Sequence, residues 1–172
     1  MKTIHQLGIC ILCTLFSISA YAQKPAHGSA HGSAQGHLLV KTVVQKEEVI
    51  VDANGEEKVQ LVDAKIVVPG DEVIYPVTFQ NISDTAAENV VITNPIAADL
   101  EYVDGSAFGP GSDIVFSVDG GTVFAAASEL SVADAGVERP AEAKDFTHIR
   151  WQMQNEIPAG SQGVARFRAR LQ

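Results

Sequence analysis

The stretch Pro69-Gly70-Asp71-Glu72-Val73-Ile74-Tyr75-Pro76-Val77-Thr78-Phe79-Gln80-Asn81 joins a turn to a strand with alternating side chains. One face of that strand would carry Val73, Tyr75, Val77 and Phe79, and the other Ile74, Pro76, Thr78 and Gln80. A period of two residues indicates a strand that buries one face. Pro76 has no amide hydrogen, so we expect it at an edge, at a bulge, or with its missing donor turned away from the neighbouring strand.

A second pattern lies near the end of the chain, where Ile149-Arg150-Trp151 is followed by Ile157-Pro158-Ala159-Gly160-Ser161. Residues 146–153 alternate, and one face would carry Thr147, Ile149, Trp151 and Met153. Residues 163–171 also alternate, with Ala165, Phe167, Ala169 and Leu171 inward and Arg166, Arg168 and Arg170 outward. The two patterns therefore predict a first and a last core strand.

A hairpin is predicted before the first core strand. Residues 39–51 and 58–68 alternate and are rich in β-branched residues, and Asp52-Ala53-Asn54-Gly55 separates them. Asn-Gly between alternating runs is a strong hairpin signal, because both residues tolerate the positive φ angles of a type I′ turn.

Further short strands are predicted at residues 90–93, 100–103 and 114–118. Each lies next to turn residues, which are Asn94-Pro95, Gly109-Pro110-Gly111 and Asp119-Gly120-Gly121. Residues 124–145 are expected to hold one strand and one long loop. Seven to nine short strands with little helical periodicity predict an all-β fold, an immunoglobulin-like antiparallel β-sandwich. A barrel is the alternative, since the sequence does not reveal whether the edges close.

The first residues predict export. Lys2 precedes an apolar run at residues 7–18, and Ala20-Tyr21-Ala22 supplies a small-x-small cleavage pattern. A retained anchor is the alternative, although the run is shorter than the roughly 20 apolar residues that span a bilayer. We therefore expect a signal peptide at 1–22, a flexible His/Gly/Ser/Ala linker at 23–37 and one domain at 38–172. The expected location is periplasmic or extracellular, including the cell surface.

Composition narrows the expected chemistry and partners. Cys10 and Cys13 both lie in the apolar run, so the mature chain would have no disulfide and no thiolate metal site. The formal net charge of −9 disfavours binding to nucleic acid, which relies on Lys and Arg. The same charge disfavours docking on anionic lipid. After signal cleavage we expect no membrane insertion.

Several ordered segments between residues 39 and 171 resemble the bacterial conserved-repeat family, domain of unknown function eleven. The segments are Pro69-Gly70-Asp71-Glu72-Val73-Ile74-Tyr75, Asn81, Glu88-Asn89-Val90-Val91-Ile92-Thr93-Asn94-Pro95, Tyr102-Val103-Asp104-Gly105-Ser106, Ser117-Val118-Asp119-Gly120-Gly121, Thr147-His148-Ile149-Arg150-Trp151 and Pro158-Ala159-Gly160-Ser161. The resemblance implies an immunoglobulin-like fold in exported or surface proteins, often as tandem repeats, with no catalytic residues to carry over. This chain departs from the pattern in its single copy, in Asn94 where Asp is common and in Pro76 where a Thr-like residue is usual. The single copy favours a small module over a long stalk.

Two motifs raise the question of a metal. His27, His31 and His37 could converge on a transition-metal ion, but their glycine-rich surroundings impose no geometry, and a solvated linker is favoured. Asp52-x-Asn54-x-Glu56 resembles the start of a calcium loop, but Gly55 is at the fourth position and Asp63 at the twelfth. A hairpin turn is favoured there, and no metal site or cofactor is assigned.

A stripe of arginines marks the last strand. If that strand paired with residues 146–153, His148 and Arg150 would share the outer face with the arginines. Such a stripe could recognise a carboxylate-rich partner. The favoured interpretation is structural, with cross-strand neutralisation by acidic residues. The candidates are Glu47, Glu48, Glu57 and Asp63.

No catalytic residues are assigned. Trp151 alternates with inward residues and is predicted to fill the core rather than to stack on a sugar. His148 is the one histidine within the predicted fold and is expected to be a surface residue. Gly-x-Ser-x-Gly, His-Glu-x-x-His and phosphate-loop motifs are missing from the sequence.

The sequence therefore favours a non-enzymatic exported module of the cell envelope that acts through protein contacts, with edge strands as docking elements. A periplasmic metal-handling protein that uses its histidine-rich tail is the alternative. A hydrolase with an unrecognised site is a more distant third.

Overall fold

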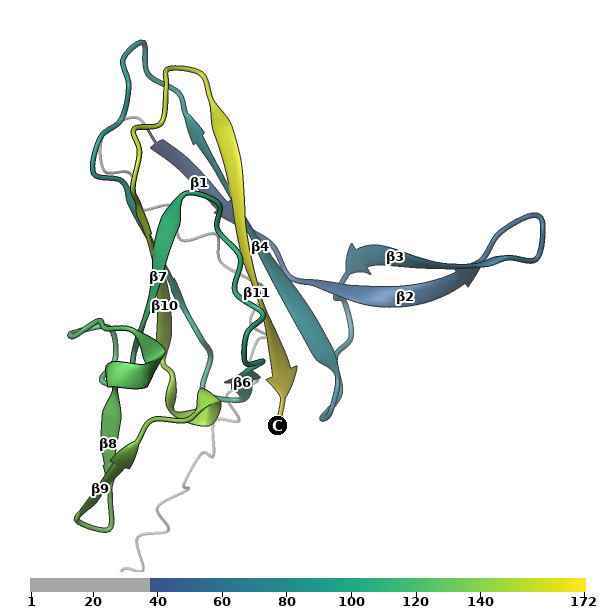
Figure 1. Ribbon diagram of the computed structural model, residues 1–172. Coiled ribbons are helices and arrows are strands. Elements are labelled where there is room, and N and C mark those ends of the chain that lie inside the picture. The colour runs from purple at the N-terminus through teal and green to yellow at the C-terminus, as the bar shows by residue number, and fades with distance from the viewer. Residues whose placement is uncertain (1–37) are drawn as a thin grey trace, which may run out of the picture.

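The computed structural model describes residues 38–172, which form an antiparallel all-β fold (Figure 1). The predicted signal peptide, the linker and His27, His31 and His37 lie outside the described residues. The strands are β1 (Leu38–Thr42), β2 (Gln45–Val51), β3 (Glu57–Asp63), β4 (Glu72–Asn81), β5 (Val91–Pro95), β6 (Leu100–Tyr102), β7 (Ser112–Ser117), β8 (Ser131–Asp134), β9 (Val137–Pro140), β10 (His148–Met153) and β11 (Gln162–Leu171). Two single-turn 3₁₀ helices are η1 (Ala127–Glu129) and η2 (Ala143–Asp145).

Two sheets form the predicted β-sandwich. The larger sheet has the order β3-β2-β4-β11-β6, with β1 also paired to β4, and the smaller sheet has the order β5-β10-β7. The core lies between their inner faces, where Ile149, Trp151, Phe167, Val73 and Val77 are almost completely buried. Within the described residues, no helix is long and apolar enough to cross a membrane.

The strands β4 and β11 form the centre of the larger sheet and follow the predicted alternation. They pair along almost their whole length, from Gln162 opposite Gln80 to Arg170 opposite Glu72. The predicted inward residues of β11 are buried or partly buried, and its three arginines lie on the outer face. The predicted alternation of β4 is confirmed as well, since Val73, Val77 and Phe79 are buried and Thr78 and Gln80 are exposed.

Pro76 explains why the strand predicted at residues 39–51 is divided into β1 and β2. Thr42 pairs with Val77 and Gln45 with Ile74, so β1 and β2 keep one register along β4. Between these pairs, Val43 donates its amide hydrogen to the carbonyl oxygen of Pro76 at 3.2 Å. Pro76 cannot return that hydrogen bond, so the pairing is interrupted in the middle of the sheet rather than at its end.

Beyond this interruption, β2 and β3 leave the sandwich as a projecting hairpin, which we call the arm (residues 45–63; Figure 1). The predicted hairpin is confirmed, but the predicted type I′ turn is wrong. Asp52 pairs with Glu56, Gly55 has a φ of 82°, and Asn54 is not among the described residues with positive φ. A three-residue loop that ends in a left-handed glycine replaces the two-residue turn.

The stretch at residues 124–145 forms more structure than we expected. It contains η1, the separate hairpin β8–β9 and η2. Arg139 and Asp145 join the hairpin to η2 through two hydrogen bonds of 2.7 and 2.9 Å. The two strands of this hairpin are four residues long and contain few apolar residues, so hydrophobic periodicity did not predict them.

The side chain of Asn81 connects the two sequence patterns that predicted the fold. Asn81 is fully buried, and its amide nitrogen donates to the carbonyl oxygens of Thr85 and Ile157 at 2.7 and 2.8 Å. Its side-chain oxygen accepts hydrogen bonds from the amide and the hydroxyl of Ser83. The turn after β4 is thereby tied to the turn before β11.

Candidate binding site

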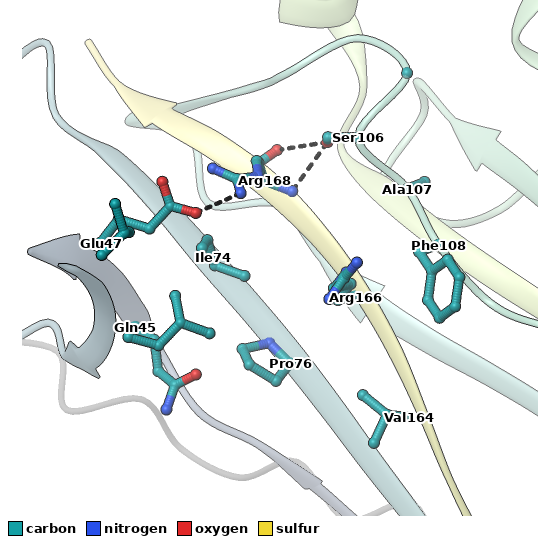
Figure 2. A pocket seen from close by; sticks show the side chains of 13 residues that line it. Gln45, Glu47, Ile74, Pro76, Ser106, Ala107, Phe108, Val164, Arg166 and Arg168 are labelled. Atoms are coloured by element: carbon teal, nitrogen blue, oxygen red, sulfur yellow. Dashed lines mark hydrogen bonds and ion pairs between the residues drawn. The ribbon is translucent and has the colours of Figure 1, made fainter.

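A groove of about 630 Å³ lies between the arm and the outer face of the larger sheet (Figure 2). The arm contributes Gln45, Glu47, Val59 and Leu61, the sheet contributes Ile74, Pro76, Val164, Arg166 and Arg168, and residues 105–108 form the opposite wall. We call the side of the arm that faces this groove its inner face. The groove exists because β2 pairs with β4 only at its base and then diverges.

The floor of the groove is partly apolar. Ile74 lies on the face of β4 that also carries the exposed Thr78 and Gln80, yet only 4% of its own surface is exposed. The base of the arm accounts for this burial, because Gln45 pairs directly with Ile74. Val164, which lies opposite Thr78 farther along the floor, remains 43% exposed.

Ser106 holds the opposite wall against β11. Its hydroxyl accepts a hydrogen bond from the amide of Arg168 at 2.9 Å and donates one to the carbonyl oxygen of the same residue at 3.3 Å. Gly105, with a φ of 69°, lets the chain turn just before it. Phe108 then exchanges two backbone hydrogen bonds of 2.8 Å with Arg166.

Arg168 joins the body of the sandwich to the arm. One of its guanidinium nitrogens lies 2.6 Å from a carboxylate oxygen of Glu47 (Figure 2). Another lies 2.9 Å from a carboxylate oxygen of Glu72. The hydrogen bonds to these carboxylates raise the pKa of Arg168, and the hydrogen bond from Arg168 lowers the pKa of Glu47. Arg170 lies 3.6 Å from the second oxygen of Glu72. Neutralisation by Glu47 is thus confirmed for Arg168, and Glu72 is a partner of Arg168 and Arg170 that we did not predict.

Arg166 differs from the other two arginines. Its guanidinium carbon lies 4.9 Å from the centre of the Phe108 ring, within the range of a cation–π contact (Figure 2). Among residues 38–172, no carboxylate lies within salt-bridge distance of Arg166. The groove therefore presents a guanidinium beside an aromatic ring that is 46% exposed.

The outer part of the arm has an aliphatic inner face. Val49 and Val59 lie opposite each other on the inner face, and they are 63% and 66% exposed. Val51 continues the same face and is opposite Glu57. A two-stranded hairpin in water is at best marginally stable without a surface to cover its apolar side chains. These residues therefore make the arm a candidate contact surface.

The last strand does not pair with residues 146–153, so the condition under which His148 and Arg150 would share a face with the arginines is not met. β11 pairs with β4 and β6, whereas β10 lies in the opposite sheet between β5 and β7. His148 and Arg150 therefore do not share a face with Arg166. Arg150 instead lies 3.4 Å from the centre of the Phe124 ring. His148 is half-buried, and this burial and the charge of Arg150 lower its pKa.

Two other predicted residues have structural roles. Trp151 is fully buried in the core, as predicted, and its indole nitrogen donates to the carbonyl oxygen of Phe108 at 3.1 Å. Asp52 accepts hydrogen bonds from the amides of Asn54 and Glu56 at 2.8 and 3.0 Å and forms an ion pair with Lys58. These bonds lower the pKa of Asp52 and fix the hairpin turn. No group of three or more metal-ligating side chains occurs within residues 38–172.

Sequence reasoning missed the wall of the groove. Ser106 and Phe108 lie between two glycine-containing turns, and an aromatic residue within such a segment is the one signal that could have singled it out. The groove itself depends on the direction of the arm, which no local pattern encodes.

Comparison with known proteins found no matching family model, curated protein or solved structure for this chain.

Proposed function

We propose that this chain is an exported, non-enzymatic module of the cell envelope that binds another protein through its arm. The partner contributes an extended segment that adds as a strand to β3. Strand addition uses main-chain hydrogen bonds for affinity and side-chain contacts for selectivity. The observation that carries the proposal is the unpaired edge of β3, a seven-residue strand that pairs only with β2 among the described strands.

The hydrogen-bond register shows which backbone groups the partner would meet. Asp52 donates its amide hydrogen to Glu56 and Ala64 donates to Val44, which fixes the alternation along the arm. The even-numbered residues of β3 therefore point their amide hydrogens toward β2. Val59 and Leu61 point theirs away from β2, to the open edge.

Exposed edges of this kind are usually protected in monomeric proteins by prolines, bulges or inward charges. The sequence of β3 has no proline, and its ladder with β2 runs without a bulge from Glu57 to Asp63. Lys58 is the one basic residue in β3, and it forms an ion pair with Asp52. The edge is therefore available for pairing.

Export and family membership are parts of the same proposal. The basic start, the apolar run at residues 7–18 and Ala20-Tyr21-Ala22 support a cleaved signal peptide. The ordered segments that resemble the conserved-repeat family support a single-copy member of that family. Location in the periplasm or at the cell surface follows from export.

The test is photo-crosslinking in cells with a reactive residue placed at Gln60, on β3 but on the side of the arm opposite the groove. We expect an adduct with a protein other than this chain, and no such adduct when the reactive residue replaces Val137 on β9. Val59→Pro should abolish the adduct because it removes an edge amide. Val59→Ala keeps that amide and should retain the adduct.

Circular dichroism would check that both variants stay folded, since the amide of residue 59 makes no hydrogen bond to β2. An adduct of equal yield with Val59→Pro would overturn strand addition. The lack of any adduct from Gln60 would overturn the arm as the binding element.

A further inference from the structure

We propose that a second copy of this chain occupies the groove. In this two-fold dimer, the outer half of each arm lies against the larger sheet of the other copy, and Glu57 of each copy forms an ion pair with Arg166 of the other. The inference goes beyond strand addition, because it uses the inner face of the arm and leaves the β3 edge open.

The first half of the contact is the outer end of the arm. Val49, Val51 and Val59 form an exposed aliphatic surface on the inner face, and Glu57 is the carboxylate beside it. Glu57 forms no ion pair with residues 38–172. This half therefore offers apolar side chains and one negative charge.

The second half is the outer surface of β11 and its surroundings. Val164 and Phe108 are exposed apolar side chains, and Arg166 is the cation between them. A neighbouring hollow of about 380 Å³ continues this surface, and Leu39 and Lys41 lie along it. This half offers apolar side chains and positive charge on a chain that carries 21 acidic and 12 basic residues.

The structure already contains one contact of the proposed kind. At the base of the arm, Glu47 on the inner face binds Arg168 of β11. Glu57 projects from the same face, opposite Val51 and therefore four positions beyond Glu47. At about 3.4 Å per residue it lies roughly 13 Å farther along the arm. The arm points away from the sandwich (Figure 1). Glu57 is the first residue of β3, at the outer end of the arm, where it is positioned for a neighbouring molecule.

A second copy is favoured over an unrelated acidic protein because one molecule carries both complementary halves on the same side of the larger sheet. A two-fold axis lets each half meet its complement, so every contact is made twice. The contact also covers the aliphatic face of a hairpin that is marginal by itself. Its two ion pairs oppose the general repulsion between two acidic chains.

The test is sedimentation velocity on the mature chain over a range of concentrations, with four variants. Arg166→Glu and Glu57→Arg should each raise the dimer dissociation constant about tenfold or more, because each change places like charges together twice. The double variant Arg166→Glu/Glu57→Arg should recover most of that loss. Glu88→Arg, which reverses an exposed charge at residue 88, outside the arm and the groove, is the matched control and should leave the dimer unchanged.

Two results would overturn the inference. One is a chain that stays monomeric up to about 1 mM, a limit beyond which association is too weak to matter. The other is a dimer that is insensitive to both single variants. A monomeric chain that still gives the Gln60 adduct with another protein would remove the dimer and leave the proposed function standing. A dimer that gives no Gln60 adduct with another protein would overturn the proposed function and leave the dimer standing.

Discussion

The indole ring of Trp151 packs directly against the backbone of Gly109. A Cβ atom at position 109 would lie 2.3 Å from Cδ1 of the indole and 2.8 Å from its nitrogen. The same nitrogen donates a hydrogen bond to the carbonyl oxygen of Phe108. A core residue thus holds the segment that carries the aromatic wall of the groove, and only glycine permits the close approach.

Gly109→Ala should lower the free energy of unfolding by about 1–3 kcal/mol, the usual range for overpacking a tight site. Urea denaturation followed by circular dichroism would measure it. In a Trp151→Phe background the smaller ring leaves space, so the added cost of Gly109→Ala should fall. Equal costs in both backgrounds would show that the two residues are not coupled.

Asn81→Ala should lower the free energy of unfolding by about 2–4 kcal/mol, because it removes four hydrogen bonds of a fully buried side chain, two donated to the carbonyl oxygens of Thr85 and Ile157 and two accepted from Ser83. Gln80→Ala, on the exposed side of the same strand, is the control and should change stability by no more than about 0.5 kcal/mol. Similar losses for the two variants would contradict the role assigned to the buried amide.

These residues mark how far the sequence could predict the fold. β4 and β11 each bury one face, so the alternation in Val73, Val77, Ala165 and Phe167 could be recognised without a structure. The arm could be predicted as a hairpin, but Val49, Ile50 and Val51 are consecutive apolar residues. Because apolar side chains lie on both faces of β2, the local pattern does not show which face is buried. It also does not show that both faces are exposed at these residues.

The candidate site was less predictable than the fold. It depends on β11 pairing with β4 rather than with β10, and that choice is made by contacts between residues about 90 positions apart. The outward direction of Arg166 and Arg168 followed from period two. The sequence does not show which of these two arginines pairs with a carboxylate, because that depends on the course of the arm. In the structure the arm places Glu47 beside Arg168 and not beside Arg166.

Ser106→Ala should destabilise the fold by about 1–2 kcal/mol, because one hydroxyl serves both the amide and the carbonyl oxygen of Arg168. Thermal and urea unfolding would give the value. Ser161→Ala, near the start of β11, is a suitable comparison and should cost less. If dimerisation uses the groove as proposed, Ser106→Ala should also weaken it, since the wall that carries Phe108 is then less firmly held.

Asp145 should make stability depend on pH at the acidic end. The two hydrogen bonds from Arg139, together with the amide of Glu142, lower the pKa of Asp145 from 3.8 to about 2. A lowered pKa in the folded state means that the contribution is complete above the unfolded value near 3.8. It disappears as pH falls through about 2.

The measurement is the difference in stability between the wild type and Asp145→Asn across this interval, with the carboxyl carbon of Asp145 titrated by NMR. The difference should be constant above pH 4 and should shrink toward pH 2. Asp134, which is 73% exposed and 3.8 Å from Arg139, is the control, and Asp134→Asn should change stability by about 0.5 kcal/mol or less. A difference that stays constant down to pH 2 would show that the Arg139 contact does not form in solution.

The arm should open without unfolding of the sandwich. Its ladder joins only β2 and β3, its side chains are mostly exposed, and its backbone hydrogen bonds have little packing to protect them. In native-state hydrogen exchange, the amides of Glu48 and Gln60 should exchange far faster than those of Tyr75 and Val77 in β4. Because a dimer would cover the arm, protection of the arm amides should rise with protein concentration while that of β4 stays constant. Arm amides as protected as those of β4 at low concentration would mean that the hairpin is rigid by itself, and the argument that its aliphatic face needs a partner would fail.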